Sequence, residues 1–298
     1  MENKTVIIIA GPTASGKTAL AMELASQLQT SIISADSRQC YIELDIGVAR
    51  PTPQQLQSIP HYFIASHHLT DEVNAMIFEQ LALDWSERIF LKNDAVIMAG
   101  GTGLYINAFC DGLDNMPAVD KSIRDDIQAG YEAGGIGWLQ EQVKKHDPAF
   151  YAEGEILNPR RLMRALEVSL GSGQSILSFR SKQKKQRPFR ILKIGTELPR
   201  EELKQNIRTR VDRMMQLGLP EEVRSLMPFR SLNALQTVGY REIIQYIDGS
   251  ISLDEAVENI KTNTWQYARR QMTWFRKDPS IHWIHPEDDQ ALKKIIKS

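Results

Sequence analysis

Short apolar runs alternate with longer amphipathic segments along the first part of the chain, and two more runs occur far downstream. Apolar runs bounded by glycine or polar residues are typical of strands buried in a parallel sheet, whereas apolar positions three and four apart predict helices, as over 75–90. The predicted strands are Val6–Ala10, Ser31–Ala35, Tyr62–Ala65, Ala95–Ala99, Arg190–Gly195 and His282–Ile284. Strands alternating with helices predict an α/β fold with a parallel-sheet core and flanking helices.

Residues 114–185 show a different pattern, because polar helical segments replace the alternation. Asp114–Pro117 breaks the order, the glycine-rich run Gly134–Gly137 is expected to interrupt a helix, and Pro159 marks a helix start. We therefore expect a helical insertion domain over these residues. The core domain would consist of 1–113 and 186–298 and would end in C-terminal helices.

Composition places the chain among ordinary globular proteins. It has 298 residues, of which 42% are hydrophobic and 24% charged, and it contains no apolar run as long as a membrane span. Cys40 and Cys110 form neither a disulfide framework nor a zinc pattern. Met1–Lys4 leads directly into the first predicted strand and leaves no room for a signal peptide. We expect a cytoplasmic monomer with no membrane contact.

The net charge of −1 excludes a uniformly basic nucleic-acid binder, but the charge is unevenly distributed. Residues 180–213 contain twelve Lys and Arg against four Asp and Glu, and residues 259–277 contain five basic residues and no acidic one. Such segments can form a local surface for a polyanion. Ordinary solvated helix faces would give the same pattern.

A phosphate-binding loop (P-loop) follows the first predicted strand. It fits G-x-x-x-x-G-K-[ST] and precedes a predicted helix, so backbone N–H groups, the helix N-terminus and the lysine all direct positive charge at one point. The loop consists of Gly11, Pro12, Thr13, Ala14, Ser15, Gly16, Lys17 and Thr18. We expect it to bind a di- or triphosphate, with the Thr18 hydroxyl placed to ligate Mg²⁺. Nucleotide- and ATP-binding proteins share this motif, so the loop alone does not identify the phosphate compound.

Two further loops are expected beside the P-loop, because carboxyl ends of parallel strands meet at one sheet edge. Asp36 follows the second predicted strand and could act as a general base, help to hold Mg²⁺ through water, or cap the next helix. Gly100–Tyr105 follows the fourth and could line a ligand or form a plain turn. The fourth strand ends without the acidic residue of motor-type ATPases, which weakens the reading as an ATP-hydrolysing machine.

Two other clusters have ordinary structural readings. His61, His67 and His68 match no common zinc spacing, so a packed or solvated role is preferred. Near the C-terminus, three aromatic residues lie among arginines, which suits either stacking on RNA bases or packing in the core. These residues are Trp265, Trp274 and Phe275, with Arg269, Arg270 and Arg276.

The ordered set of motifs resembles one family, the bacterial tRNA dimethylallyltransferases, also called tRNA isopentenyltransferases. The resemblance covers nearly the whole chain, and although the P-loop is shared by a superfamily, the ordered set is specific. The matching segments are Gly11–Thr18, Ser34–Ser37, Leu44–Gly47, Arg50–Thr52, Gly100–Tyr105, Arg161–Glu167, Val238–Glu242 and Tyr267–Phe275.

The resemblance implies a reaction and roles for particular residues. A dimethylallyl group would move from dimethylallyl diphosphate to the exocyclic N6 of the adenosine 3′ of the anticodon in tRNA. Asp36 matches the family's general base, Thr13 a threonine near the reacting centre, and Arg210 the arginine that contacts the diphosphate. The P-loop would then hold a diphosphate leaving group, with Mg²⁺ at Thr18.

By the same resemblance, the anticodon stem-loop is the partner, and the target base must leave its stack to react. The helical insertion would close over the anticodon stem. The implied tRNA contacts are Asp36, Ser37, Arg38, Gln39, Thr102, Arg124, Asn158, Pro159, Arg160, Arg161 and Leu162. The chain departs from the family pattern in a shorter segment after Leu69, in Asn158 for Asp, in Trp265 for Arg and in Arg269 for Lys.

Two other functions compete with this interpretation. In a small-molecule or nucleotide kinase, the P-loop would hold ATP and Asp36 would activate a hydroxyl. That reading gives no task to the basic C-terminal segment. A non-catalytic tRNA-binding relative is the third hypothesis, and the intact Lys17, Thr18 and Asp36 argue against it.

Overall fold

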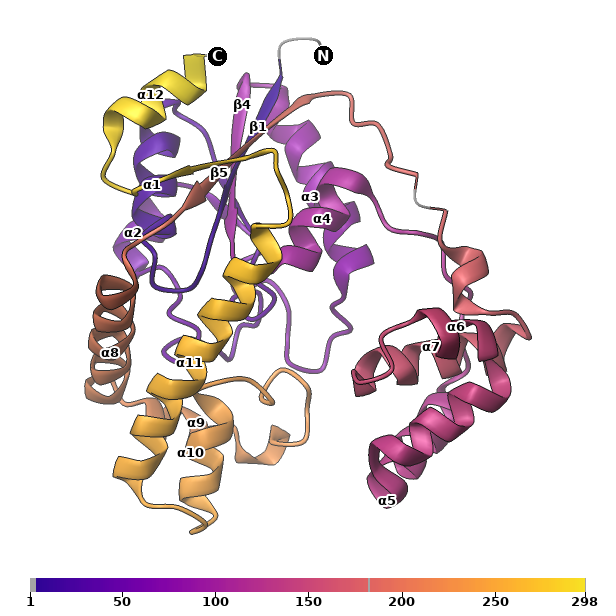
Figure 1. The fold of residues 1–298 in the computed structure, drawn as a ribbon. Helices are drawn as coiled ribbons and strands as arrows, with labels where there is room; N and C mark the ends of the chain where they lie inside the picture. The colour runs from indigo at the N-terminus through magenta and orange to yellow at the C-terminus, as the bar shows by residue number, and fades with distance from the viewer. Residues whose placement is uncertain (1–3, 182, 298) are drawn as a thin grey trace. The chain divides into compact units, whose positions relative to one another are not determined.

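A six-stranded parallel sheet forms the centre of the larger part of the molecule (Figure 1). The computed structural model describes residues 4–181 and 183–297, so Met1–Asn3, on which the signal-peptide expectation rests, lie outside it. The strand order is β3-β2-β4-β1-β5-β6, and all paired strands run parallel. The strands are β1 (Thr5–Ala10), β2 (Ile32–Ser34), β3 (His61–Tyr62), β4 (Ala95–Gly100), β5 (Arg190–Thr196) and β6 (Ile281–Ile284). The predicted parallel α/β core is confirmed.

The central strand β1 explains why its residues are almost all apolar. It pairs with β4 on one side, with Ala10 opposite Gly100, and with β5 on the other, with Ala10 opposite Gly195. Helices cover both faces of the sheet, so residues pointing to either face are buried, and Val6 to Ala10 are at most 3% exposed.

Helices lie on both faces of the sheet, as Figure 1 shows. One face packs against α1 (Lys17–Gln27) and α12 (Asp289–Lys297), where Ile7 and Ile9 belong to the same buried cluster as Leu20, Leu24 and Leu292. On the other side of the strands in Figure 1 lie α3 (Ala75–Phe90), as predicted, and α4 (Gly103–Asp111). A short helix, α2 (Pro53–Ser58), precedes β3.

The predicted strand Tyr62–Ala65 is wrong in its extent, because β3 ends at Tyr62. Phe63 and Ala65 have φ angles of 61° and 44°, in the left-handed region, where a strand cannot continue. Phe63 is nevertheless only 1% exposed and packs edge-on against Phe78. The apolar run therefore reflects burial of a turn, which periodicity alone does not distinguish from a strand.

Four helices lie beyond the carboxyl ends of the strands (Figure 1). They are α8 (Arg200–Gln216), α9 (Leu219–Ser225), α10 (Tyr240–Ile247) and α11 (Leu253–Phe275), with the short 3₁₀ turn η2 (Met227–Phe229) between α9 and α10. Gly218, at φ 95°, forms the turn between α8 and α9. These helices bring basic and aromatic residues to the sheet edge that carries the P-loop.

Asp111–Lys185 forms a second compact unit that is entirely helical among its described residues. Its elements are α5 (Lys121–His146), α6 (Pro148–Glu153), α7 (Pro159–Ser172) and η1 (Ile176–Phe179). Gly135, at φ 65° and ψ −160°, kinks α5 within the predicted glycine-rich break. Buried Asp147 connects two of these elements by accepting the N–H groups of Phe150 and Ile176, each at 3.0 Å.

In the part of the chain that the structure describes, no helix combines the length and apolar character needed to cross a membrane.

Candidate active site

The P-loop connects β1 to α1, and its Ser15 and Gly11 pack against the carboxyl end of β5. The Ser15 hydroxyl donates to the Pro12 carbonyl at 2.8 Å and lies 2.6 Å from the Thr196 hydroxyl at the end of β5. A Cβ on Gly11 would lie 2.5 Å from the Thr196 Oγ1, so only glycine fits there. Nothing in the local sequence pointed to Thr196, which reaches the loop from 181 residues away.

Two cations and one hydroxyl converge at the mouth of this loop. Arg210, on α8, donates from Nη1 to the Thr13 Oγ1 at 3.0 Å. The Lys17 ammonium donates to the Pro12 carbonyl. Burial, and then the positive charge of Arg210, lower the pKa of Lys17 to about 7, and burial also lowers the pKa of Arg210. Two cations held this close together at a phosphate-binding loop form a site for a highly charged anion.

Asp36 lies beside these cations, in the turn after β2. Its Oδ1 accepts the N–H groups of Arg38 at 2.9 Å and Gln39 at 3.3 Å, while Oδ2 makes no hydrogen bond to the described residues. The two readings of Asp36 are therefore compatible, because one oxygen caps the turn and the other is available to a substrate. The Ser37 N–H donates to the Thr102 Oγ1 at 3.0 Å and so joins this turn to the glycine loop after β4.

Gln271, on α11, connects the P-loop to the glycine loop. Its Oε1 accepts the Thr13 N–H at 2.8 Å, and its Nε2 donates to the Gly101 carbonyl at 2.9 Å. The side chain is 6% exposed, so both bonds are shielded from water. Tyr267, one turn earlier, lines the same space, and burial followed by the nearby Asp36 carboxylate raises its pKa to about 12. Both residues lie in the segment Tyr267–Phe275, but its sequence predicts no role for either of them.

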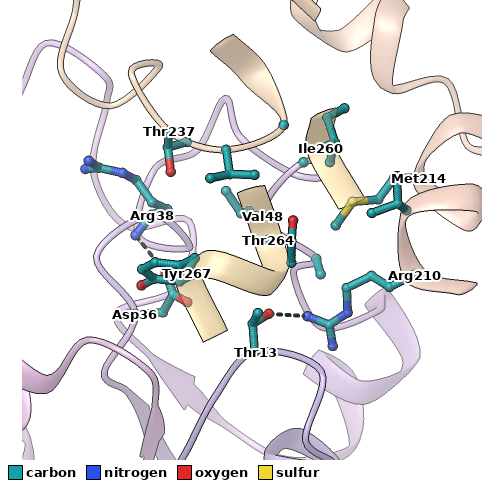
Figure 2. Close-up of a pocket in the computed structure, with 15 residues that line it drawn as sticks. Thr13, Asp36, Arg38, Val48, Arg210, Met214, Thr237, Ile260, Thr264 and Tyr267 are labelled. Atoms are coloured by element: carbon teal, nitrogen blue, oxygen red, sulfur yellow. Dashed lines mark hydrogen bonds between the residues drawn. The ribbon is translucent and has the colours of Figure 1, made fainter. Parts of the chain in front are cut away.

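Two adjoining cavities meet at these residues. The first, of about 340 Å³, follows the P-loop and includes Lys17 and Thr18. The second, of about 120 Å³, is shown in Figure 2; it is lined by aliphatic side chains and by polar ones, most of which it shares with the first cavity. The two cavities share the lining residues Thr13, Asp36, Val48, Ala49, Arg210 and Tyr267. An anion-binding space thus opens directly into an apolar one, with Thr13 and Asp36 at the junction.

The loop that carries Val48 and Ala49 is fixed by a buried network. Glu222 accepts the N–H groups of Ile46 at 2.7 Å and Gly47 at 3.1 Å, and the Tyr240 hydroxyl at 2.6 Å. Gly47 is required because a Cβ there would lie 2.5 Å from the Tyr240 ring. On its other side, the Gln39 amide donates to the Val48 and Ala49 carbonyls. The cavity wall is therefore preorganised before any ligand binds.

The remaining predicted tRNA contacts lie in the second unit. Arg124 is on α5, and Asn158 caps α7 by accepting the Arg161 N–H at 3.4 Å. An aspartate would cap the helix in the same way, so Asn158 preserves this local structure. Arg124 and Arg160 are exposed, whereas Leu162 is fully buried in the unit's core, so its side chain has no surface to offer a tRNA.

The aromatic and basic residues near the C-terminus divide between core and surface. Phe275 is 3% exposed and packs inside, whereas Trp274 is 37% exposed and lines a surface hollow with Arg269, Arg270 and Lys277. Trp265 is flanked by Arg200 and Lys204, each 5.6 Å from its ring centroid.

His61 and His68 have separate hydrogen-bond partners and do not form a common site. His68 bonds Glu43 at 2.9 Å and His61 bonds the Ile59 carbonyl, and among the described residues no group of three or more His, Cys, Asp or Glu could hold a metal ion.

Comparison with known proteins places these features in one family. The family model described as "IPP transferase" matches residues 39–278. The chain is 45% identical to tRNA dimethylallyltransferase 1 of Bacteroides thetaiotaomicron, over 98% of this chain and 95% of that protein. The crystal structure of the tRNA isopentenylpyrophosphate transferase of Bacillus halodurans is similar with a TM-score of 0.70 and 32% identity, over 99% and 94% of the two chains. A eukaryotic dimethylallyltransferase acting on tRNA gives a TM-score of 0.78 at 26% identity, over 98% and 78%.

Proposed function

The chain belongs to the tRNA dimethylallyltransferase family and is a prenyltransferase, and on that premise we propose the details of its reaction. It transfers the dimethylallyl group of dimethylallyl diphosphate to N6 of the adenosine 3′ of the anticodon in tRNA. The family relationship does not favour the kinase or the non-catalytic binder. A monomeric state and a cytoplasmic location stay predictions.

The observation that carries this proposal is the junction of the two cavities. The P-loop cavity, with Lys17 and Arg210, suits a diphosphate. Thr13 and Asp36 face both cavities, so a carbon attached to that diphosphate would lie beside a carboxylate. A P-loop enzyme that transfers phosphate would need its acceptor at the terminal phosphorus, whereas this site places the carboxylate beside an apolar space.

The chemistry follows from this arrangement. The lone pair of N6 attacks C1 of the allylic group, the C1–O bond breaks, and its electron pair leaves on the diphosphate. The proton of N6 passes to the Asp36 carboxylate, whose Oδ2 is available for it. Lys17, Arg210 and the backbone N–H groups of the P-loop stabilise the negative charge that develops on the leaving group. Arg210 also holds the Thr13 hydroxyl beside the reacting carbon.

The site also suits Mg²⁺. Thr18 is exposed at the start of α1 and lines the diphosphate cavity. Mg²⁺ is usually held by one or two protein groups together with substrate phosphates, so a cage of protein carboxylates is not needed. Thr18, with Asp36 acting through water, would hold the ion, which when bound supplies positive charge to the leaving diphosphate.

We propose that the anticodon stem-loop binds to basic residues of both units while its target base reaches Asp36. Arg38 lines the apolar cavity, and Arg269, Arg270 and Lys277 lie on α11 or directly after it. Arg124 and Arg160 of the helical unit are also exposed. Neutralisation of phosphates by such residues supplies much of the affinity of proteins for nucleic acids.

A direct assay tests the proposal. The protein is incubated with an unmodified tRNA transcript, Mg²⁺ and dimethylallyl diphosphate, and the digested nucleosides are weighed by mass spectrometry. We expect adenosine to gain one dimethylallyl group at the position 3′ of the anticodon. Absence of that product while tRNA still binds would refute the proposed reaction, and modification at another adenosine would refute the proposed position.

A further inference from the structure

We infer that the apolar cavity holds the hydrocarbon of the diphosphate donor and that Met214, at its far end, limits the donor to five carbons. The inference rests on the proposed function. It goes beyond that function by naming a residue that determines donor specificity. Figure 2 shows Met214 and Ile260 together at the end of the cavity away from Asp36.

The lining of this cavity suits a branched hydrocarbon. Six aliphatic side chains contribute to it, from the 44–50 loop, α8, the segment before α10, and α11. They are Val48, Ala49, Val211, Met214, Val238 and Ile260. The polar lining lies mainly toward the P-loop cavity, which shares Thr13, Asp36, Arg210 and Tyr267 with this one. Thr237 and Thr264 add hydroxyls, and Arg38 reaches the cavity from the side of Asp36 (Figure 2). Burying an apolar group here replaces contact with water by contact with aliphatic carbon, which is favourable.

The position of Met214 on α8 links the cavity to the diphosphate. Arg210 and Met214 are four residues apart, so they lie on the same helix face about 6 Å apart along the axis. A donor whose diphosphate is held by Arg210 therefore has its hydrocarbon within reach of Met214. The opposite wall of the cavity is one face of α11, formed by Ile260, Thr264 and Tyr267. This face also leads from Met214 toward the P-loop.

The cavity opens into the P-loop cavity, and its volume limits how much hydrocarbon can lie beyond the junction of the two. It measures about 120 Å³. An apolar cavity of about 150 Å³ in another protein takes up benzene, a ring of six carbons. A five-carbon dimethylallyl group therefore fits, whereas the ten-carbon geranyl group would have to extend into the space that Met214 and Ile260 occupy. Ile260 is 1% exposed and fixed in the core, while Met214 is half-buried and lies at the surface end.

Competition between two donors tests this inference. We would measure kcat/KM for dimethylallyl diphosphate and for geranyl diphosphate, with the same unmodified tRNA, for the wild type and for Met214→Ala. We expect the ratio of geranyl to dimethylallyl transfer to rise by roughly tenfold or more, since one methylene in a tight apolar pocket is worth about 10-fold to 200-fold in discrimination. With geranyl diphosphate the bonding changes are the same: C1–O breaks, C1–N6 forms, and the proton goes to Asp36.

Met215 provides a matched control, because it is the next residue on α8, is also half-buried and does not line the cavity. Met215→Ala should leave the donor ratio unchanged. Met214→Val, a smaller truncation, should shift the ratio in the same direction by less, and a thermal melt of each variant checks that the fold is intact. A ratio unchanged in Met214→Ala, or shifted equally in Met215→Ala, would overturn the inference.

The same data separate this inference from the proposed function. Turnover of dimethylallyl diphosphate by the wild type tests the function alone. If the wild type is active and Met214→Ala raises the KM for tRNA without changing the donor ratio, the cavity receives the adenine base and the inference is wrong. Inhibition of the dimethylallyl reaction by geranyl diphosphate gives a second readout, since Met214→Ala should lower its inhibition constant and Met215→Ala should not.

Discussion

At the scale of single residues, Asp36 uses its two carboxylate oxygens for different tasks. Oδ1 accepts two backbone N–H groups and holds the turn, and Oδ2 faces the site without a partner among the described residues. Asparagine can keep the first task, because its amide oxygen accepts the same bonds, but it cannot take a proton. The substitution therefore separates structure from chemistry at one position.

We expect Asp36→Asn to lower kcat by roughly 10²-fold to 10⁴-fold, the usual contribution of a general base, while tRNA affinity stays nearly unchanged. Single-turnover assays and tRNA binding titrations would measure the two quantities. Asp71→Asn is the control, because Asp71 accepts the His68 N–H at 2.7 Å but lines neither cavity. Substantial turnover by Asp36→Asn would remove Asp36 from the role of base.

Lys17 should make the binding of diphosphate depend on pH. In the free protein its pKa is about 7, lowered first by burial and then by Arg210, whereas a bound anion would raise it again. Above pH 7 the free protein must take up a proton to bind, so affinity should be highest below pH 7. It should fall by up to about tenfold per pH unit above it.

Calorimetric titration of inorganic diphosphate between pH 6.5 and 9, as a rough working range, would measure this dependence. Lys17→Gln provides the reference, because titration of diphosphate itself affects both proteins equally and cancels in the difference. The difference between the two proteins should shrink steadily as the pH rises. A difference that is constant across the range would show that Lys17 stays charged in the free protein.

How much of the site the sequence could predict depends on how local each contact is. The P-loop and Asp36 were found because each follows a strand directly, and strand ends are visible in the apolar pattern. Thr196 and Gln271 were missed because their partners lie 181 and 258 residues away. Thr196 belongs to no suggestive local pattern, and although Gln271 lies in the matching segment Tyr267–Phe275, only the tertiary fold reveals the contacts of either residue.

At the scale of secondary structure elements, α11 joins the parts of the site. Ile260, Thr264, Tyr267 and Gln271 follow one another at spacings of four, three and four, which is one face of a helix. This face leads from the apolar cavity to the P-loop. The ends of strands were harder to predict than the ends of helices. Phe63 and Ala65 show why, because a buried turn and a buried strand have the same apolar composition.

Gln271→Leu should weaken the connection between α11, the P-loop and the glycine loop after β4. The Thr13 N–H and the Gly101 carbonyl would lose their buried partner, which typically costs about 1–3 kcal/mol. We expect a lower free energy of unfolding in urea and a reduced kcat/KM for dimethylallyl diphosphate. Gln205→Leu, on the exposed side of α8, is the control and should change neither quantity. Full stability and activity in Gln271→Leu would mean that the bridge is dispensable.

At the scale of the whole molecule, a chain with a net charge of −1 must bind a polyanion through a local surface. The hollow lined by Arg269, Arg270, Trp274 and Lys277 is a basic surface on the helix, α11, that also lines the site, and we propose that it serves this purpose. Composition alone left open whether these basic segments are solvated faces or a binding surface. The fold places Arg269, Arg270 and Lys277, all from the second of these segments, in one hollow, whereas Arg180, Lys184 and Lys185 of the first segment belong to the helical unit.

We expect tRNA affinity to fall steeply with salt, and Arg270→Gln to reduce the slope of log K against log salt by about 0.7 to 1. Filter binding of tRNA at several salt concentrations would measure the slope. Lys92→Gln is the control, because Lys92 is exposed between α3 and the start of β4, at the opposite edge of the sheet. A slope that Arg270→Gln leaves unchanged would place the tRNA elsewhere.

The order of the strands also determines when the protein can become functional during its synthesis. The central strand β1 pairs with β5, whose Arg190 lies opposite Thr5, and all of the helical unit is made between them. Because the ribosome adds about 5–20 residues per second, β5 is synthesised roughly ten seconds or more after β1. The helical unit is contiguous and can fold during that interval. Because Thr196 closes the P-loop from β5, we expect a nascent chain to acquire its phosphate site only after this late strand has emerged.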